Sequence, residues 1–244
     1  MLEFIAMSAI AGTNCHYQGP YLVKGLAYDP VDRQLQYCEY YTSKENDEII
    51  VFYYSPEGDL IAEKTLQERD GAAASRSALP NVTQVDRRHG EVREVLWQDS
   101  QWKMRYRANE DKDWKVSLRD ARSIDVIDAG FDTYVRDHWG SLASGETLNF
   151  NFASPMHGRS IKLRARMVSC NREASEDTCI RVDVAQPLIR LFVKDLNLTY
   201  DTASRRLKSF KGIVNILDSQ ANSQQLEVFY QYSMPPSGTL PAHP

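Results

Sequence analysis

Ionisable residues gather between positions 128 and 138, where Asp128, Asp132, Arg136 and His138 follow one another closely. On a helix, Asp132 and Arg136 are i,i+4 neighbours, and Asp128 is a plausible N-cap near the positive end of the helix dipole. A carboxylate beside a histidine supplies general acid–base capacity near neutral pH. Capping and a surface ion pair explain the same residues without any chemistry, and we keep both interpretations.

A further candidate is His157, which lies in a polar loop between two alternating segments and would stand at a rim. A solvated hairpin loop is the simpler interpretation. Basic residues also line one face of each of two predicted strands: Lys103, Arg105 and Arg107, and Lys162, Arg164 and Arg166. From these rows we select Arg105 and Arg164 as candidate ligand-binding residues. Guanidinium groups bind anions such as lipid headgroups or acidic partners. A solvated face that discourages edge aggregation is the alternative.

The chain contains no complete catalytic, metal or nucleotide motif. There is no G-x-S-x-G, no Walker A and no G-x-G-x-x-G sequence, and the histidines lack the spacing of a zinc site. We therefore predict no catalytic residue, no metal and no cofactor, and favour a protein that is not an enzyme. Since 29 basic residues face 33 acidic ones, for a formal net charge of -4, nucleic acid is not an expected partner.

The four cysteines indicate in which cellular compartment the protein is located. Two alternating segments flank a polar loop and predict a β-hairpin that places Cys170 opposite Cys179, and Arg166 opposite Asp183. Opposed residues of that kind lie within disulfide range, so we predict this bridge. Cys15 and Cys38 are candidates for a second disulfide, and a plain thiol at Cys15 is the alternative. Reduced thiols in a cytoplasmic protein are the alternative.

The N-terminal residues 1–14 are interpreted as a signal-peptide remnant or an ordinary N-terminal segment. Leu2 to Ala11 has the length of a signal-peptide apolar region and ends in an A-x-A pattern, but Glu3 stands where a basic residue is expected. With the cysteines, this favours a periplasmic or otherwise exported protein over a cytoplasmic one. No apolar run approaches the roughly 18 residues that a transmembrane helix needs, so we predict that the protein does not span a membrane.

Alternating apolar and polar residues predict antiparallel strands along most of the chain. The predicted strands are residues 21–28, 34–41, 48–54, 59–66, 82–87, 91–98, 102–107, 114–118, 147–153, 160–168, 179–184, 196–200, 207–216 and 225–232. Helical spacing replaces alternation between Gly130 and Leu142, which predicts an amphipathic helix, and residues 187–193 predict a short helical turn.

These elements predict a mainly β protein: a large curved antiparallel meander sheet or open barrel with one amphipathic helix packed across it. A two-sheet sandwich buries the same alternate residues and stays open as the alternative. We assign residues 15–233 to a single β-rich domain and 234–244 to a Pro-rich disordered tail.

Two segments resemble uncharacterised proteobacterial proteins with exported β-rich domains: residues 126–132 (VIDAGFD) through Trp139, and Leu198 to Asp201 through residues 210–216 (FKGIVNI). The resemblance implies one domain and an envelope location, and it carries over no catalytic residue. We expect a non-enzymatic envelope protein that binds a hydrophobic or amphipathic ligand, such as an apolar or anionic small molecule or a lipid, or that binds a partner. An envelope enzyme using Asp128, Asp132 and His138, and a structural interaction domain, are the alternatives.

Overall fold

One antiparallel sheet of fourteen strands dominates the part of the chain that the structure describes. The computed structural model describes residues 15–44, 48–68, 78–170, 176–186 and 195–233. The strands are β1 (Val23–Tyr28), β2 (Leu35–Ser43), β3 (Ile49–Tyr54), β4 (Leu60–Gln67), β5 (Asn81–Asp86), β6 (Glu91–Gln98), β7 (Gln101–Arg107), β8 (Lys115–Asp120), β9 (Leu148–Ser154), β10 (Arg159–Val168), β11 (Asp177–Val184), β12 (Leu196–Asp201), β13 (Leu207–Ile213) and β14 (Gln225–Tyr232). Each predicted strand overlaps one of these, which confirms the mainly β fold class.

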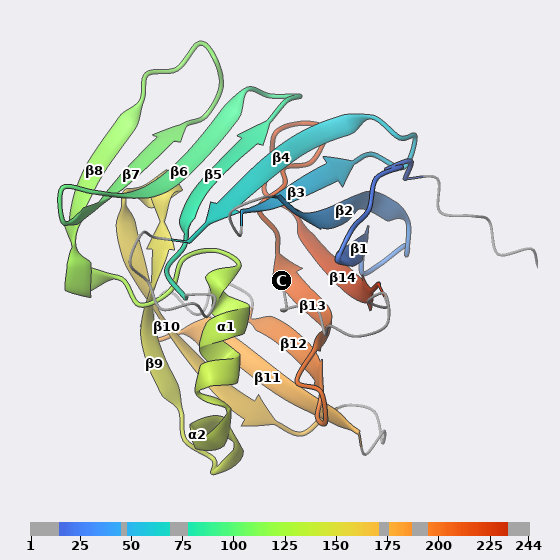
Figure 1. Ribbon diagram of the computed structural model, residues 1–244, viewed down its shortest axis with the longest axis vertical. Coiled ribbons are helices and arrows are strands. Elements are labelled where there is room, and N and C mark those ends of the chain that lie inside the picture. Colours follow the sequence, from blue (N-terminus) through green and yellow to red (C-terminus); the bar gives the residue numbers. More distant parts are fainter. Residues whose placement is uncertain (1–14, 45–47, 69–77, 171–175, 187–194, 234–244) are drawn as a thin grey trace, which may run out of the picture.

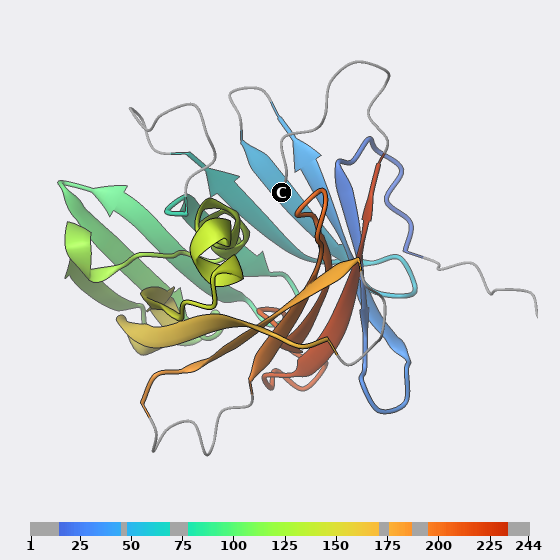
Figure 2. The same ribbon diagram turned by 90° about the horizontal axis from the view of Figure 1, so that it is seen from below.

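The sheet curves round on itself without closing. Strands β1 to β8 form one half, β9 to β14 form the other, and the pairing of β1 with β14 joins the halves in the middle of the strand order. Figures 1 and 2 show the helical segment held between the two halves. The outer strands β8 and β9 do not pair, but Arg119 on β8 donates a hydrogen bond to the carbonyl of Gly158, beside the short 3-10 turn η3 (Pro155–His157). The fold is thus the predicted curved open sheet rather than a sandwich.

Apolar side chains on the concave face form two adjoining cores. The larger core lies under strands β1 to β7 and includes the fully buried Val51 and Trp102. The smaller core joins strands β9 to β12 to the helices, with Phe150 and Tyr200 at its centre. Because one face of each strand points into these cores, inward residues alternate with outward ones, and this alternation is what made the strands recognisable in the sequence.

The predicted single helix is two helices, α1 (Gly130–Asp137) and α2 (Trp139–Ala143), separated at His138. After the break, the Trp139 ring packs edge-on against Tyr200 at 5.6 Å between centroids. Gly130 permits the start of α1, because a Cβ there would lie 2.4 Å from the carbonyl oxygen of Ala78. Within the described residues, no helix is long and apolar enough to cross a membrane.

Asp128 does not cap α1, and that prediction was wrong. Ala129 occupies the N-cap position, while Asp128 precedes it in the left-handed region with φ of 46°. The Asp128 carboxylate instead accepts hydrogen bonds from Lys64 and Asn215, which come from other parts of the chain. The predicted ion pair between Asp132 and Arg136 does form, at 3.0 Å.

Both predicted disulfides are present, Cys15–Cys38 and Cys170–Cys179. They are typical of proteins exported to an oxidising environment. The predicted hairpin register was wrong by two residues, because Cys179 pairs with Val168 in β10 while Cys170 lies beyond the strand end. A shift of two keeps every side chain on its own face, so alternation cannot detect it.

In the observed register Arg164 lies opposite Asp183, and Arg166 lies opposite Arg181. The Asp183 carboxylate receives both Arg164 and Arg166, at 2.7 and 2.9 Å. This shared acceptor explains how two like charges fit on neighbouring positions of one face. The predicted N-terminal segment, the helical turn at residues 187–193 and the C-terminal tail lie outside the described residues.

Candidate functional site

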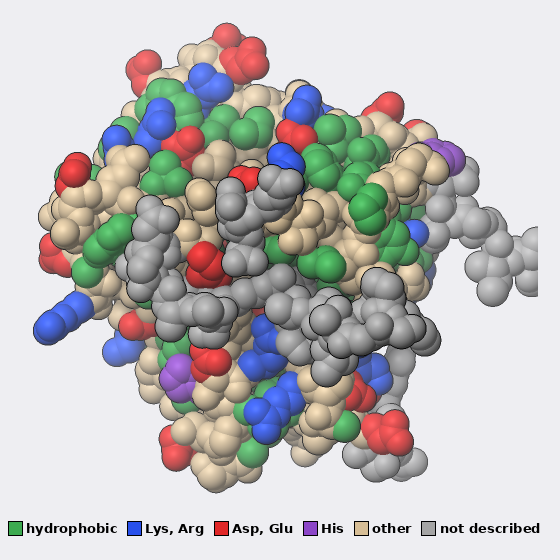
Figure 3. Space-filling view, viewed as in Figure 1, with side chains coloured by type: hydrophobic (Ala, Val, Ile, Leu, Met, Phe, Trp, Pro, Cys, Tyr) green, Lys and Arg blue, Asp and Glu red, His purple; other side chains and the backbone are tan. Residues whose placement is uncertain are grey.

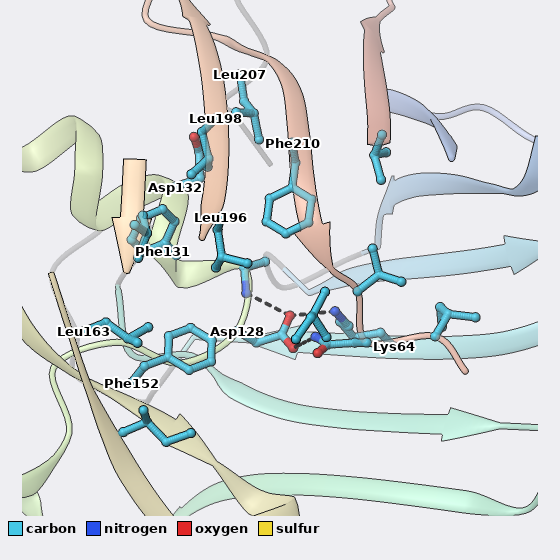
Figure 4. A pocket seen from close by; sticks show the side chains of 18 of the residues that line it. Lys64, Asp128, Phe131, Asp132, Phe152, Leu163, Leu196, Leu198, Leu207 and Phe210 are labelled. Atoms are coloured by element: carbon cyan, nitrogen blue, oxygen red, sulfur yellow. Dashed lines mark hydrogen bonds and ion pairs between the residues drawn. The ribbon is translucent and has the colours of Figure 1, made fainter. Parts of the chain in front are cut away.

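A cavity of about 520 Å³ lies between the start of α1 and the concave face of the sheet. Its volume falls within the usual range for small-molecule sites, about 300–1,000 Å³. Strands from both halves of the sheet contribute to its wall, which is mostly apolar. The labelled apolar side chains in Figure 4 are Phe131, Phe152, Leu163, Leu196, Leu198, Leu207 and Phe210. A wall of this kind favours a ligand with a substantial hydrophobic part.

A buried ion pair forms the polar side of the cavity, away from most of these apolar residues (Figure 4). Lys64 projects inward from β4, and its Nζ lies 2.6 Å from Oδ1 of Asp128. The same carboxylate accepts a hydrogen bond from the backbone N–H of Ala129, and its Oδ2 accepts one from the Asn215 amide at 2.6 Å. Only 6% of the Lys64 side chain and 16% of that of Asp128 are exposed, so each charge depends on the other for solvation.

Glu39 is a second buried carboxylate on this side. Its Oε1 accepts a hydrogen bond from the Tyr41 hydroxyl at 3.3 Å. Burial raises the pKa of Glu39 to about 6, although Lys64 and the hydroxyls of Tyr230 and Tyr41 favour the charged form. Desolvation therefore outweighs those stabilising contacts, and Glu39 titrates closer to neutral pH than an exposed glutamate does.

Four tyrosines surround Glu39 on the cavity wall: Tyr37, Tyr41, Tyr53 and Tyr230. Burial, followed by the nearby Glu39 carboxylate, raises the pKa of each phenol well above its ordinary value. These hydroxyls consequently stay protonated and available as hydrogen-bond donors. The polar side of the cavity thus combines neutral donors with two carboxylates and a single ammonium group.

A smaller cavity of about 170 Å³ lies next to the first and shares Asp128 and Asn215 with it. Asn215 links the two, because its carbonyl oxygen also accepts a hydrogen bond from the buried Gln84 amide. Arg93 lines this smaller space and pairs with the buried Glu91 at 2.9 Å. Its lining is consequently more polar than that of the large cavity.

The structure brings three of the predicted site residues to the large cavity: Asp128, Asp132 and His157. They do not form a catalytic group with one another. Asp132 pairs with Arg136, and the His157 ring lies 2.8 Å from the Ser154 hydroxyl. Asp128 is occupied by the contacts described above.

The remaining candidates do not line the cavity. The His138 ring hydrogen-bonds the Tyr134 carbonyl at 2.8 Å, and its centroid lies 4.2 Å from that of the Tyr134 ring with the two planes tilted by 34°. Arg105 lies on the convex face and pairs with Glu94, whereas Arg164 pairs with Asp183, which is one of the residues that line the cavity. Arg105 also stacks on the Trp114 ring, at 4.1 Å from its centroid. On the face seen in Figure 3, basic and acidic side chains are interspersed in the same way.

Sequence reasoning missed Glu39, Lys64 and Asn215. A signal for the first two was present, because a charged residue at an inward position interrupts the apolar side of a strand. Glu39 lies between Tyr37 and Tyr41 on the same face of β2. Asn215 follows β13 without any comparable pattern. Throughout the described ranges, no group of three or more His, Cys, Asp or Glu residues is arranged to hold a metal ion.

Comparisons with known proteins identify no family. No protein-family model matches the chain, and no curated protein sequence matches it. One solved structure that is similar is the crystal structure of a β-barrel-like protein of a domain of unknown function, DUF1849, from Brucella abortus. It is 6% identical, covers 87% of this chain and 97% of its own, and has a TM-score of 0.41. It comes from a proteobacterium, but a similarity at this level supports no argument about function.

Proposed function

We propose that this protein is a non-enzymatic binding protein of the cell envelope that holds a hydrophobic or amphipathic ligand in the large cavity. The observation that carries the proposal is the cavity itself, about 520 Å³ of space with a mainly apolar wall and a confined polar side. Burying an alkyl chain in such a space contributes about 0.8 kcal/mol for each methylene group. A small, well-defined set of polar groups then orients the ligand.

Two further features support this role. The candidate acid–base residues have separate structural partners, as expected of a binding protein rather than of an enzyme. The two disulfides suit a protein that works outside the cytoplasm, and we place it in the periplasm. Within this proposal, α1 is the wall that covers the ligand, because Phe131 and Asp132 of that helix line the cavity.

Native mass spectrometry of the full chain, purified from its own host, tests the proposal. We expect a reproducible bound mass that disappears on denaturation. Leu196→Trp places an indole in the cavity, so this variant should lose the bound mass. Val31→Trp introduces the same side chain at a turn position that is 90% exposed, and this control should keep it. A bound mass that survives Leu196→Trp in folded protein, or its absence from every sample, would contradict the proposal.

A further inference from the structure

The charges on the polar side of the cavity bear on which ligand fits there. Resting on the function proposed above, we infer that the ligand is an amphiphile whose buried end is a protonated amine, held by Glu39. The apolar wall alone does not determine the chemical class of the ligand's polar group. It follows from how each charge that lines the cavity is compensated.

All but one of the lining carboxylates have a cationic partner. Asp128 pairs with Lys64, Asp132 pairs with Arg136, and Asp183 receives two arginines. For Glu39, the described residues provide tyrosine hydroxyls but no ammonium or guanidinium group at ion-pair distance. The two remaining basic residues of the lining, Arg159 and Lys162, are exposed to solvent on β10. The buried side is therefore one positive charge short when Glu39 is ionised.

The backbone makes specific room for this carboxylate. Gly25 of β1 lies directly opposite Glu39 of β2. A Cβ at Gly25 would lie 2.5 Å from the Glu39 Cγ and 2.7 Å from its Oε1, closer than atoms can approach. Any other residue at position 25 would displace the carboxylate from its place on the concave face. Glycine inside a strand is otherwise unfavourable, so the sheet accepts a local cost here.

An amine is the polar group that complements this arrangement. A primary ammonium would donate a charge-assisted hydrogen bond to Glu39 and neutralise it. The surrounding tyrosine rings also suit a cation, as shown by the Lys64 Nζ, which lies 5.8 Å from the centroid of the Tyr53 ring. A carboxylate or phosphate at the same place would add a third negative charge beside Glu39 and Asp128, and a hydroxyl group would leave Glu39 uncompensated.

Three probes that share one alkyl chain separate the inference from the function on which it rests. Binding of dodecylamine, dodecanoic acid and dodecanol to the delipidated full chain is measured by isothermal titration calorimetry, with each probe below its micelle concentration or its solubility limit. We expect dodecylamine to bind about tenfold or more tightly than dodecanol, since a hydrogen bond to a charged group contributes about 1.5–3 kcal/mol. Dodecanoic acid should bind most weakly.

Glu39→Gln removes the charge and keeps the side-chain shape. This variant should lose the preference for dodecylamine over dodecanol, so that the ratio of the two affinities falls about tenfold or more. Glu63→Gln is the matched control, because Glu63 also lies in a strand but pairs with Arg87 away from the cavity. Its three affinities should equal those of the wild type.

A pH series on the wild type needs no variant. Lowering the pH from about 7.5 to about 5 protonates Glu39 and should weaken dodecylamine binding about tenfold, with little change for dodecanol. The charged and titratable groups that face Glu39 are Lys64, Asp128 and the four tyrosines at positions 37, 41, 53 and 230. The tyrosines stay neutral over this range.

The outcomes are distinct. If dodecanol binds but dodecylamine has no advantage over it, or if dodecanoic acid binds best, the inference is wrong and the binding function stands. If the dodecylamine preference survives Glu39→Gln in folded protein, the amine is held elsewhere and the inference is again wrong. If none of the three probes binds, the proposed function and the inference both fail.

Discussion

Two ion pairs on opposite faces of the sheet show how exposure to solvent changes what an ion pair contributes to stability. On the convex face, Arg105 of β7 lies 2.9 Å from Glu94 of β6, and 31% of the arginine side chain is exposed. On the concave face, Lys64 lies 2.6 Å from Asp128, and only 6% of the lysine side chain is exposed. The distances are alike, whereas the cation is partly open to water on one side and enclosed beside a mostly apolar cavity on the other.

The difference teaches which charges the fold depends on. The two carboxylates are about equally buried, with 14% of the Glu94 and 16% of the Asp128 side chain exposed, so the difference lies in the cations. Water can solvate Arg105 when Glu94 is removed, so the convex pair contributes little to keeping that cation in place. Lys64 lacks that alternative, and removing Asp128 leaves it buried and uncompensated. Glu39 extends the contrast, because it is buried on the concave face without an ion-pair partner among the described residues.

The largest expected effect follows from breaking the concave pair. Asp128→Ala leaves the Lys64 ammonium buried and also removes the acceptor of the Asn215 amide. We expect the free energy of unfolding to fall by about 3–5 kcal/mol, as for other buried pairs that lose one partner. Urea denaturation followed by circular dichroism measures it.

A double variant sharpens that result. Lys64→Met combined with Asp128→Ala removes both charges, so most of the lost stability should return, because an apolar replacement of a buried pair is often close to neutral. If the double variant is as unstable as Asp128→Ala, the loss comes from the backbone conformation at position 128 rather than from an uncompensated lysine.

The sequence predicted the strands better than it predicted how they are placed against one another. The pattern of apolar residues identified every strand of the sheet, because each strand buries at least one face against a core. It could not identify the register of β10 and β11, since a shift of two residues leaves the faces unchanged. The separation of α1 from α2 at His138 was also missed, because the helical spacing of the apolar residues continues across it.

The candidate site was predicted only in part. Asp128 was correctly selected as notable, but it was assigned to helix capping because Lys64 and Asn215 are remote in sequence. Local spacing describes neighbours along a helix and says nothing about which strands the curvature of the sheet brings together. Glu39 and Lys64 were detectable as charges on inward positions of strands, and that signal reflects burial rather than local propensity.

The ionisation of Glu39 should change the free energy of unfolding by an intermediate amount, and the direction of the change follows from its pKa. Its pKa is raised to about 6 in the folded protein, so the folded state binds the proton more tightly than the unfolded chain does. The stability that this proton contributes is fully present below about pH 4.5 and is lost as the pH rises through about 6. The difference amounts to about 2 kcal/mol.

Comparison with Glu39→Gln isolates that contribution from those of other carboxylates. Relative to the wild type, this variant should gain about 2 kcal/mol of unfolding free energy between about pH 4 and about pH 7, because glutamine cannot ionise. The measurement is urea denaturation at a series of pH values. A constant difference between the two proteins over this range would show that burial does not penalise the Glu39 carboxylate.

The smallest effect is expected on the convex face, where Glu94→Gln removes the charge that pairs with Arg105. Arg105 keeps its position over the Trp114 ring and its access to water, so the free energy of unfolding should fall by less than about 1 kcal/mol. Raising the salt concentration should reduce even this difference, because solvent ions reach the partly exposed Arg105 and screen its charge. Urea denaturation at low and high salt measures both. A loss as large as that of Asp128→Ala would mean that exposure does not distinguish the two pairs, and the contrast between the faces would then need another cause.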